Sequence, residues 1–251
     1  MMGKMKSKNI KNSLYLFLSL LFVYVILFEF ILPINRVLPK PTVLFESFSH
    51  LWAYYNFGMA LASTIGVVYI SIGLGFILTW LLRSIIIKLL LGYVKSINTL
   101  QLFRYFPAFF FVILFTFWFD ASITAQFIFS TLAFIFLLIQ NINLELPSVR
   151  EEYKLVAVNL NPAKFDSEIF WFSILPKLFI QMKKIHYYIW TLVLLYEFVS
   201  NSFGLGSIYR SILEYNDFGA LITVALVISL LIWLGSFLIQ FAKNKLASWE
   251  A

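Results

Sequence analysis

The residues of this sequence that could do chemistry are few, and the most informative is Glu197. It lies near the end of the apolar run 180–199, and a carboxylate buried in a membrane is costly enough to be a functional-site hypothesis by default. The alternative is a carboxylate at the membrane interface that hydrogen-bonds the turn at 204–206. Asn141 ends another apolar run, 123–142, where it could cap a helix or line a solute pathway.

Two phenylalanines of a third apolar run, Phe111 and Phe115, are further candidates for a solute pathway. Such side chains most often face lipid or fill a core. They can also form a hydrophobic constriction that gates a pathway by dewetting. We therefore predict a pathway set that combines Glu197, Asn141, Phe111 and Phe115.

Enzymatic chemistry has little support in the residue types. The chain has no cysteine, which excludes disulfides, thiolate metal sites and cysteine nucleophiles. His50 and His186 are far apart in sequence and form no local ligand pair. No HExxH, GxSxG or Walker A lysine motif is present. We therefore predict no catalytic residue, no metal site and no cofactor, and any ATP would have to be bound by another chain.

The composition is that of a membrane protein. Of the 251 residues, 61% are hydrophobic and 12% are charged, whereas soluble domains average roughly 45–50% and about 25%. The net charge is +7, but the cations lie between apolar runs instead of forming a nucleic-acid-binding patch. A soluble domain, a disordered chain and a nucleic-acid partner are therefore excluded.

The apolar runs predict an all-α membrane protein with six spans in a single domain over residues 1–251. A span needs about 20 apolar residues, and the first run is longer than the apolar part of a signal peptide, so we expect an uncleaved anchor. The short apolar stretch 83–95 is bounded by charges and predicts an interfacial or elbow segment. The predicted spans are 13–32, 59–82, 102–119, 123–142, 180–199 and 220–241.

The distribution of lysine and arginine predicts the orientation. With both termini inside, the inner segments hold 16 of the 19 cations. The positive-inside rule therefore favours an N-in, C-in topology, which an even number of spans also requires. These inner segments are 1–12, 83–104, 146–184 and 243–251.

Two segments outside the spans are predicted to be amphipathic helices. The outer one, 38–48, begins with prolines and a possible cap at Thr42, and it is either a helix in the headgroup layer or part of an external docking surface. The inner one follows Asn161-Pro162, a helix-start signal, and places Phe165, Ile169 and Phe172 on one face. It is either a helix resting on lipid or a knob that inserts into a cytoplasmic partner.

Several motifs in this order resemble those of the membrane permease subunits of bacterial ABC importers of the nitrate, sulfonate and taurine type. The similarity covers nearly the whole chain. The family's cytoplasmic loop has the pattern E-A-A, three residues, Gly, then a helix and a closing I-x-L-P. Matching residues are Leu38-Pro39-Lys40-Pro41, Leu102-Phe103-Arg104 with Pro107, Phe117-Trp118-Phe119, Ala157, Leu160, Ile174-Leu175-Pro176, Glu197, Gly204-Leu205-Gly206 and Trp249.

The chain also departs from the family pattern at defined positions. Leu155 stands where the family's motif glutamate is expected, and Asn161 and Asp120 stand where it has glycine. Asparagine can adopt the left-handed conformation that glycine provides, so the turn at Asn161 can be retained.

The resemblance implies a permease that forms the translocation pathway by alternating access and is driven by two cytoplasmic ATPase subunits. It implies a second permease chain, identical or different, an external substrate-binding protein, and a place as a multi-pass protein in the bacterial inner membrane. The helix 162–172 would be the coupling helix. The implied ATPase-coupling residues are Ala157, Leu160, Asn161, Pro162, Ala163, Lys164, Phe165, Asp166, Ser167 and Glu168.

Other functions remain open. A non-transporting scaffold or sensor derived from such a permease would also anchor a cytoplasmic partner. An ion-driven carrier would need ionisable residues in mid-span, and we place those of this chain at the flanks. The expected substrate is a small anion or a small organic compound.

Overall fold

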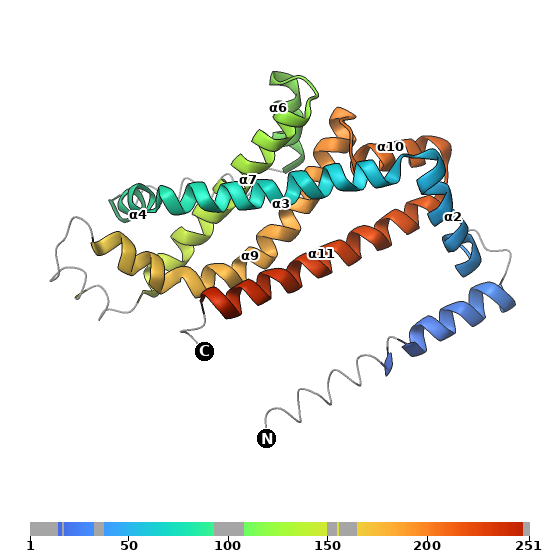
Figure 1. Cartoon of the computed structure of the whole chain (residues 1–251), viewed down its shortest axis with the longest axis horizontal. Helices are drawn as coiled ribbons and strands as arrows, with labels where there is room; N and C mark the ends of the chain where they lie inside the picture. The colour runs from blue at the N-terminus through green and yellow to red at the C-terminus, as the bar shows by residue number, and fades with distance from the viewer. Residues whose placement is uncertain are drawn as a thin grey trace. The chain divides into compact units, whose positions relative to one another are not determined.

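The protein is described by a computed structural model that covers residues 15–16, 18–32, 38–92, 108–149, 155 and 165–247. These residues are predominantly helical and none of them forms a strand, which confirms the all-α prediction. The helices are Leu18–Ile31, which ends in the π-helix η1 (Ile26–Ile31), α2 (Pro41–Tyr54), α3 (Phe57–Leu81), α4 (Arg83–Gly92), α6 (Ala108–Trp118), α7 (Ile123–Glu145) with η3 (Leu146–Ser148), α9 (Phe165–Ser200), α10 (Leu205–Tyr215) and α11 (Phe218–Leu246) (Figure 1).

Three helices of the described part are long and apolar enough to cross a membrane: Phe57–Leu81, Ile123–Ser148 and Phe218–Leu246. They coincide with the predicted spans 59–82, 123–142 and 220–241. In the regions of the other predicted spans, Leu18–Ile31 and α6 are shorter apolar helices. The long helix α9 is not among the three, and it carries several charged residues.

The chain divides into two compact units, the first comprising Met1–Phe57 and Ile212–Leu226. Here the end of the first helix is tied to the start of α2. Tyr24 donates a hydrogen bond of 2.6 Å to the Pro39 carbonyl, and the Thr42 hydroxyl donates one of 3.1 Å to the Glu29 carboxylate. The predicted cap at Thr42 is therefore wrong: the N-cap of α2 is Lys40, and Thr42 bonds Glu29 instead.

The same unit contains the first turns of α11, which lie against α2. A Cβ at Gly219 would collide with the Ser47 hydroxyl and the Val43 side chain, so glycine is needed for this close approach. One turn later, Thr223 Oγ1 lies 3.4 Å from the Leu44 carbonyl. Small residues on one helix face allow this packing.

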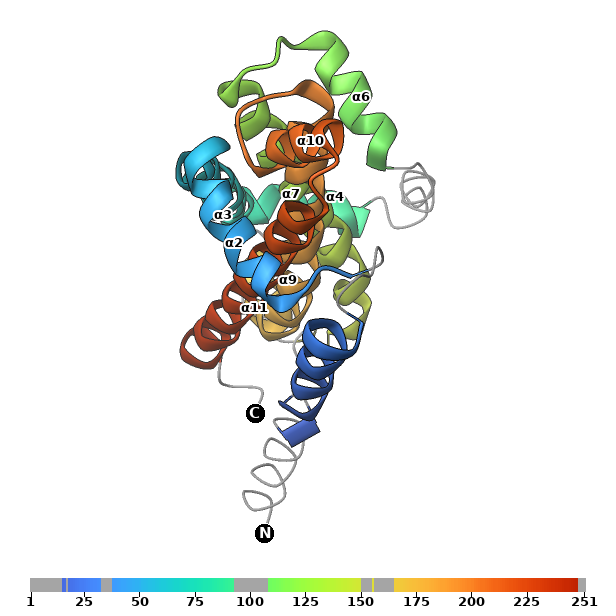
Figure 2. The same cartoon turned by 90° about the vertical axis from the view of Figure 1, so that its right-hand side faces the viewer.

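The second unit comprises Gly58–Ser211 and Val227–Ala251, and α9 is its central helix. Helix α9 packs along α7, α6 and α4, and Figures 1 and 2 show α7 beside it in both views. The apolar residues at this centre are completely or almost completely buried: Phe134, Leu138 and Ile142 from α7, and Leu178, Ile185, Ile189 and Val193 from α9.

Helix α9 begins earlier and runs longer than the sequence predicts. Residues 165–172 are its first two turns, not a separate helix, and the motif residues 174–176 lie inside it. Pro176 removes one backbone hydrogen bond, a defect that membrane helices tolerate because neighbouring groups compensate. The predicted coupling residues from Ala157 to Lys164, which include the predicted helix start at Pro162, lie outside the described residues.

The segment after α3 forms an elbow. Leu82 is in a turn, and α4 follows from Arg83 to Gly92. Figure 1 shows α3 from the side and α4 nearly end-on, so the chain changes direction sharply at this turn. The predicted elbow is confirmed over 83–92.

Asparagine rather than glycine forms the left-handed ends of three helices. Asn56, Asn201 and Asn216, with φ of 49°, 54° and 56°, follow α2, α9 and α10, and no described glycine has a positive φ. Asparagine is among the few non-glycine residues that visit this region readily. Asn161, for which the sequence predicts the same role, lies outside the described residues.

Candidate functional site

The Glu197 carboxylate is completely buried in the second unit, where it accepts hydrogen bonds from three directions. Gln126 Nε2 of α7 donates to Oε1 at 2.7 Å, and Thr64 Oγ1 of α3 lies 2.8 Å from the same oxygen. The Gly206 amide of α10 donates to Oε2 at 2.8 Å. We call these four residues the glutamate junction. It joins α3, α7, α9 and α10.

The amino end of α10 is built around this carboxylate. The Leu205 amide donates to Thr64 Oγ1 at 2.9 Å, beside the bond from Gly206 to Glu197. The first amides of a helix lack partners within the helix and favour a negative charge. A Cβ on Gly204 would collide with the Glu197 carboxylate, and one on Gly206 would collide with the Leu194 carbonyl. Glycine is therefore required sterically at position 206, and a side chain at position 204 would displace the carboxylate.

This geometry combines parts of both sequence interpretations of Glu197. The carboxylate bonds the turn at 204–206, as the second interpretation expects, but it is buried rather than exposed at an interface. Its partners all present donors, so Glu197 holds four helices in place. Thr64 and Gln126 are not among the residues predicted from the sequence, although a threonine and a glutamine inside apolar spans are themselves a signal for buried hydrogen bonding.

Phe111 and Phe115, both predicted pathway residues, pack beside the glutamate junction. They contact a buried cluster of Val112, Phe129 and Tyr196. The ring centroids of Phe115 and Phe129 are 5.2 Å apart. The two phenylalanines therefore join α6 to α7 and α9 next to Glu197.

Asn141 lies elsewhere. Its side-chain amide donates 2.7 Å to the Leu137 carbonyl of its own helix. At 1.5 Å per residue it is about 22 Å along α7 from Gln126. The structure therefore brings three of the four predicted pathway residues together and separates the fourth.

Residues 165–168 of the predicted coupling set form the first turn of α9, and side chains are described for Ser167 and Glu168. The side chains of Phe165 and Asp166 lie outside the described set. Ser167 is buried, and Glu168 forms a salt bridge of 3.0 Å with Arg83 of α4. The Arg83 guanidinium also lies 5.0 Å from the Trp80 ring centroid. The start of α9 is therefore fastened to the elbow after α3.

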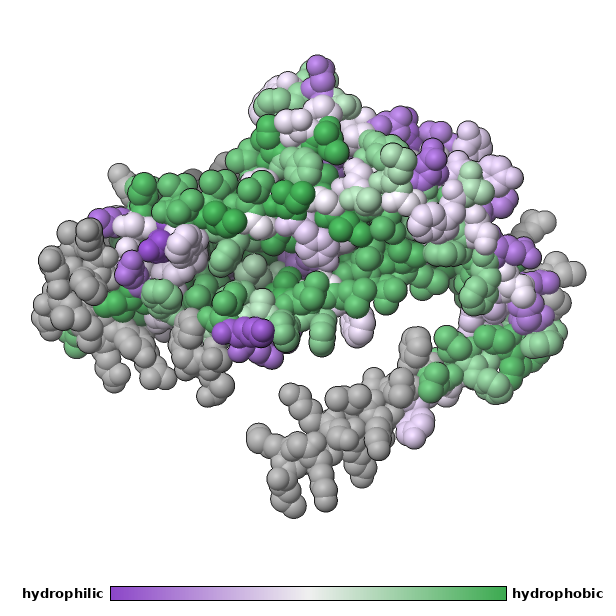
Figure 3. Space-filling view, in the orientation of Figure 1, coloured by the Kyte–Doolittle hydropathy of each residue, from purple (hydrophilic) through white to green (hydrophobic). Residues whose placement is uncertain are grey.

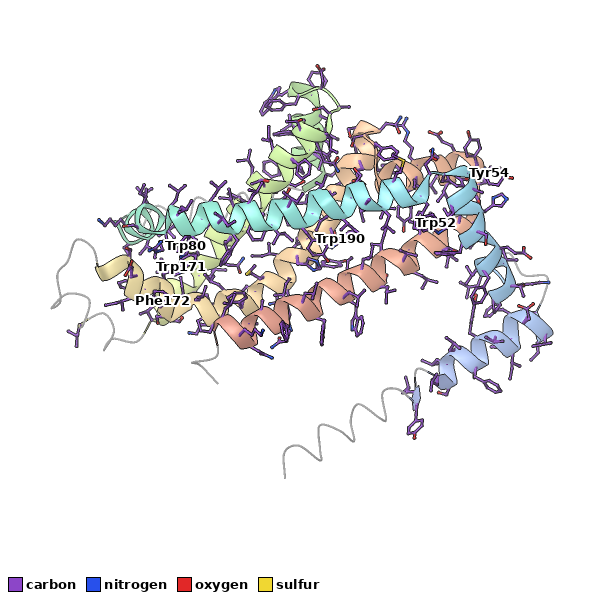
Figure 4. All side chains as sticks on the ribbon, in the orientation of Figure 1. Trp52, Tyr54, Trp80, Trp171, Phe172 and Trp190 are labelled. Carbon is purple, nitrogen blue, oxygen red and sulfur yellow. The ribbon has the colours of Figure 1, made fainter. Side chains whose placement is uncertain are left out.

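Phe172, on the predicted apolar face of this segment, is 51% exposed, as a face directed at lipid or at a partner would be, so the choice between these two stays a prediction. The buried residues are Phe170 and Trp171. Trp171 packs on Phe76 of α3, with ring centroids 6.3 Å apart. In Figure 4, Trp171 and Trp80 both lie at the end of α3 that leads to α4. Contacts with other helices, rather than the local spacing of phenylalanines, select the buried face.

Helices α7 and α9 are joined by polar contacts at two heights, which we call the two polar levels. The glutamate junction is one, and the other lies at the opposite end of α7. Lys177 Nζ of α9 donates 2.8 Å to Ser148 Oγ, the last residue of the candidate span Ile123–Ser148. The glutamate junction fixes the other end through Gln126 and Glu197. Between these two levels α9 rises about 30 Å, the thickness of a bilayer's hydrocarbon core. Helix α9 therefore covers the same length as its neighbouring span.

Between the two levels, α9 carries the buried His186. Trp190 Nε1 donates 3.0 Å to His186 Nε2, and the Tyr69 hydroxyl of α3 lies 3.4 Å from the same nitrogen. A Cβ on Gly235 of α11 would collide with Tyr69 and His186. An indole N–H only donates, so the bond from Trp190 specifies the tautomer with the proton on Nδ1. In Figure 4, the Trp190 label lies between the ribbons of α3 and α11.

We find no candidate metal site in the described part of the chain. No group of three His, Cys, Asp or Glu residues that could hold an ion occurs there. Comparison of the sequence with protein-family models and with curated proteins gave no match.

Proposed function

We propose that this chain is the permease subunit of an ATP-binding-cassette importer, with the translocation pathway formed by its spans. Three helices suited to cross a membrane support a multi-pass protein, and α9 covers the same length between its two polar levels. The motifs that carry the family resemblance supply the class. ATP hydrolysis belongs to partner subunits.

The observation that carries this proposal furthest is the bond between Glu197 and Gly206. The resemblance rests in part on a glutamate followed at a fixed distance by Gly-Leu-Gly. In this fold the two elements are one physical unit, because the carboxylate occupies the space that Gly204 leaves free and the backbone of α9 occupies the space beside Gly206. A shared steric requirement explains the joint occurrence of these residues better than coincidence does.

We further propose six spans with both termini inside the cell, in the bacterial inner membrane. The contacts at the inner level support this orientation. Arg83 pairs with Glu168, and Lys177 bonds Ser148. All four residues fall in the segments that the positive-inside rule places in the cytoplasm.

Coupling would pass through the loop that includes Ala157, Leu160 and Asn161 into the start of α9. Because residues 165–172 are continuous with α9, a push on this segment would move the whole helix together with the elbow held by Arg83. The proposed partners are a cytoplasmic ATPase dimer, a second permease chain and an external substrate-binding protein.

A scaffold or sensor that anchors an ATPase without transport is the second candidate. Leu155, at the position of the family's motif glutamate, favours it. The test is reconstitution of the purified complex into liposomes. ATP-dependent uptake of a small anion into the liposomes supports the permease, whereas ATP hydrolysis that no solute stimulates and no uptake accompanies supports the scaffold.

A further inference from the structure

One exposed face of α9 differs in chemistry from the exposed faces of its neighbours. Lys184, Tyr187, Tyr188 and Thr191 follow the spacing i, i+3, i+4, i+7, which places them on one side of a helix. All four are exposed, and the two tyrosines are each 55% exposed. We call these four residues the polar stripe.

The exposed faces of the candidate spans are apolar at the same depth. On α3 they present Ile70, Leu74 and Ile77, and on α11 they present Leu230, Leu234 and Phe237. Figure 3 shows the corresponding hydrophobic surface along both helices. Lipid contact explains those faces, and it is compatible with Thr191, whose hydroxyl donates to the Tyr187 carbonyl at 3.1 Å, but it does not explain a lysine and two tyrosines.

The depth of the stripe excludes an ordinary interfacial anchor. Lys177 marks the inner level because it bonds Ser148 at the end of a candidate span. Lys184 is about 10 Å farther along the helix and Thr191 about 20 Å. Lysine and tyrosine anchors sit at the headgroup level, whereas polar residues within the hydrocarbon layer face a protein interior or a water-filled cavity.

The charge of this part of α9 points to the sign of its ligand. Between Glu168 and Glu197 the helix carries Lys177, Lys183 and Lys184 and no acidic residue. Tyrosine hydroxyls add hydrogen-bond donors, and the Tyr187 and Tyr188 rings lie 6.0 Å apart on the same face. A cationic, donor-rich face attracts an anion.

We infer that the polar stripe lines the middle of a water-filled pathway and binds the translocated solute, a small anion. This inference rests on the proposed function and deepens it by assigning the residues that contact the solute within the membrane. Lys184 supplies the charge, Tyr187 and Tyr188 donate hydrogen bonds, and Thr191 marks the deepest position.

The chain has no cysteine, so single cysteines test this inference directly in the full-length protein. Tyr187→Cys, Tyr188→Cys and Thr191→Cys are made separately, with Leu74→Cys and Leu230→Cys as exposed apolar controls. Inside-out membrane vesicles are treated with an anionic or a cationic methanethiosulfonate, each calibrated against a free thiol. Charged reagents reach a cysteine only through water.

The stripe cysteines are expected to react roughly tenfold faster than the controls, and faster with the anionic than with the cationic reagent. Lys184→Gln should remove the anion preference, and Lys184→Arg should retain it. Reaction no faster than the controls, or reaction without a preference for the anion, would overturn the inference. Spontaneous disulfide-linked dimers of Tyr188→Cys that the reagents do not label would overturn it too, because the stripe would then be a contact between copies.

The labelling experiment can fail independently of the proposed importer function. Labelling rates depend on water and charge at the stripe and require no ATPase. An anion-preferring stripe in a chain that binds no ATPase would reject the importer class and keep the anion pathway. If the stripe cysteines react no faster than the apolar controls in a chain that does bind an ATPase, the pathway is rejected and the importer class stands.

Discussion

The Gly206 amide donates a hydrogen bond of 2.8 Å to the Glu197 carboxylate, nine residues earlier in the chain. This bond closes the turn between α9 and α10 and presses the carboxylate against α3 and α7. It depends on the missing side chain at Gly206, where a Cβ would collide with the Leu194 carbonyl. The junction is therefore both a steric and an electrostatic fit.

Gly206→Ala is expected to destabilise the protein by about 1–3 kcal/mol, because the added methyl group must displace backbone. The matched control is Gly73→Ala, since a Cβ at Gly73 meets nothing within 4 Å. Thermal stability of the two variants in detergent, followed by size-exclusion chromatography, measures the difference. Equal midpoints for both variants would show that the close approach at Gly206 is absent.

Thr64→Val should also destabilise the junction, because the hydroxyl bonds Glu197 and accepts from the Leu205 amide. The buried Leu205 amide is then left without an acceptor, which costs about 1–3 kcal/mol, and Glu197 loses one of its donors. Thr64→Ser retains the hydroxyl and is expected to stay close to the native midpoint. The prediction fails if valine, which has nearly the shape of threonine, is tolerated as well as serine.

Charge reversal tests the contact between the elbow and α9. Arg83→Glu and Glu168→Arg should each weaken the protein, and the double variant should recover part of the loss, because the salt bridge of 3.0 Å is then rebuilt in reverse. The coupling energy is expected to be at most about 1 kcal/mol, since Glu168 is half exposed. Arg83→Glu should cost more than Glu168→Arg, because it also removes the contact with Trp80. Additive losses in the double variant would contradict the pairing.

The topology can be tested with single cysteines at exposed positions. Ser148→Cys is expected to react with a membrane-impermeant thiol reagent from the cytoplasmic side, and Phe203→Cys from the outside. Both positions are exposed. Labelling of both from one side would contradict a span between them.

The sequence predicted the helices where local pattern alone determines the outcome. Long apolar runs identify α3, α7 and α11, and the prolines before Thr42 predict the start of α2. It did not predict what packing decides. Helix α9 is continuous from Phe165 to Ser200, and Trp171 in its first turns is buried because it packs on Phe76 of another helix.

The candidate site was predicted only in part for a related reason. Glu197 and its glycines stand out in the sequence because a charge within an apolar run is rare. Thr64 and Gln126 do not, because their role depends on helices that meet far apart in the chain. The stripe at Lys184, Tyr187, Tyr188 and Thr191 follows a helical spacing that the sequence does contain. This spacing goes unnoticed when Lys183 and Lys184 are assigned to the inner flank of the predicted span 180–199.

The importer class is tested most directly by ATP hydrolysis in the complex purified from native membranes with a tag on this chain. The account predicts that a cytoplasmic ATPase co-purifies, that hydrolysis in lipid requires both chains, and that a small anion stimulates it. Purification of this chain without any ATP-hydrolysing partner, under conditions in which the chain stays folded and monodisperse, would contradict it.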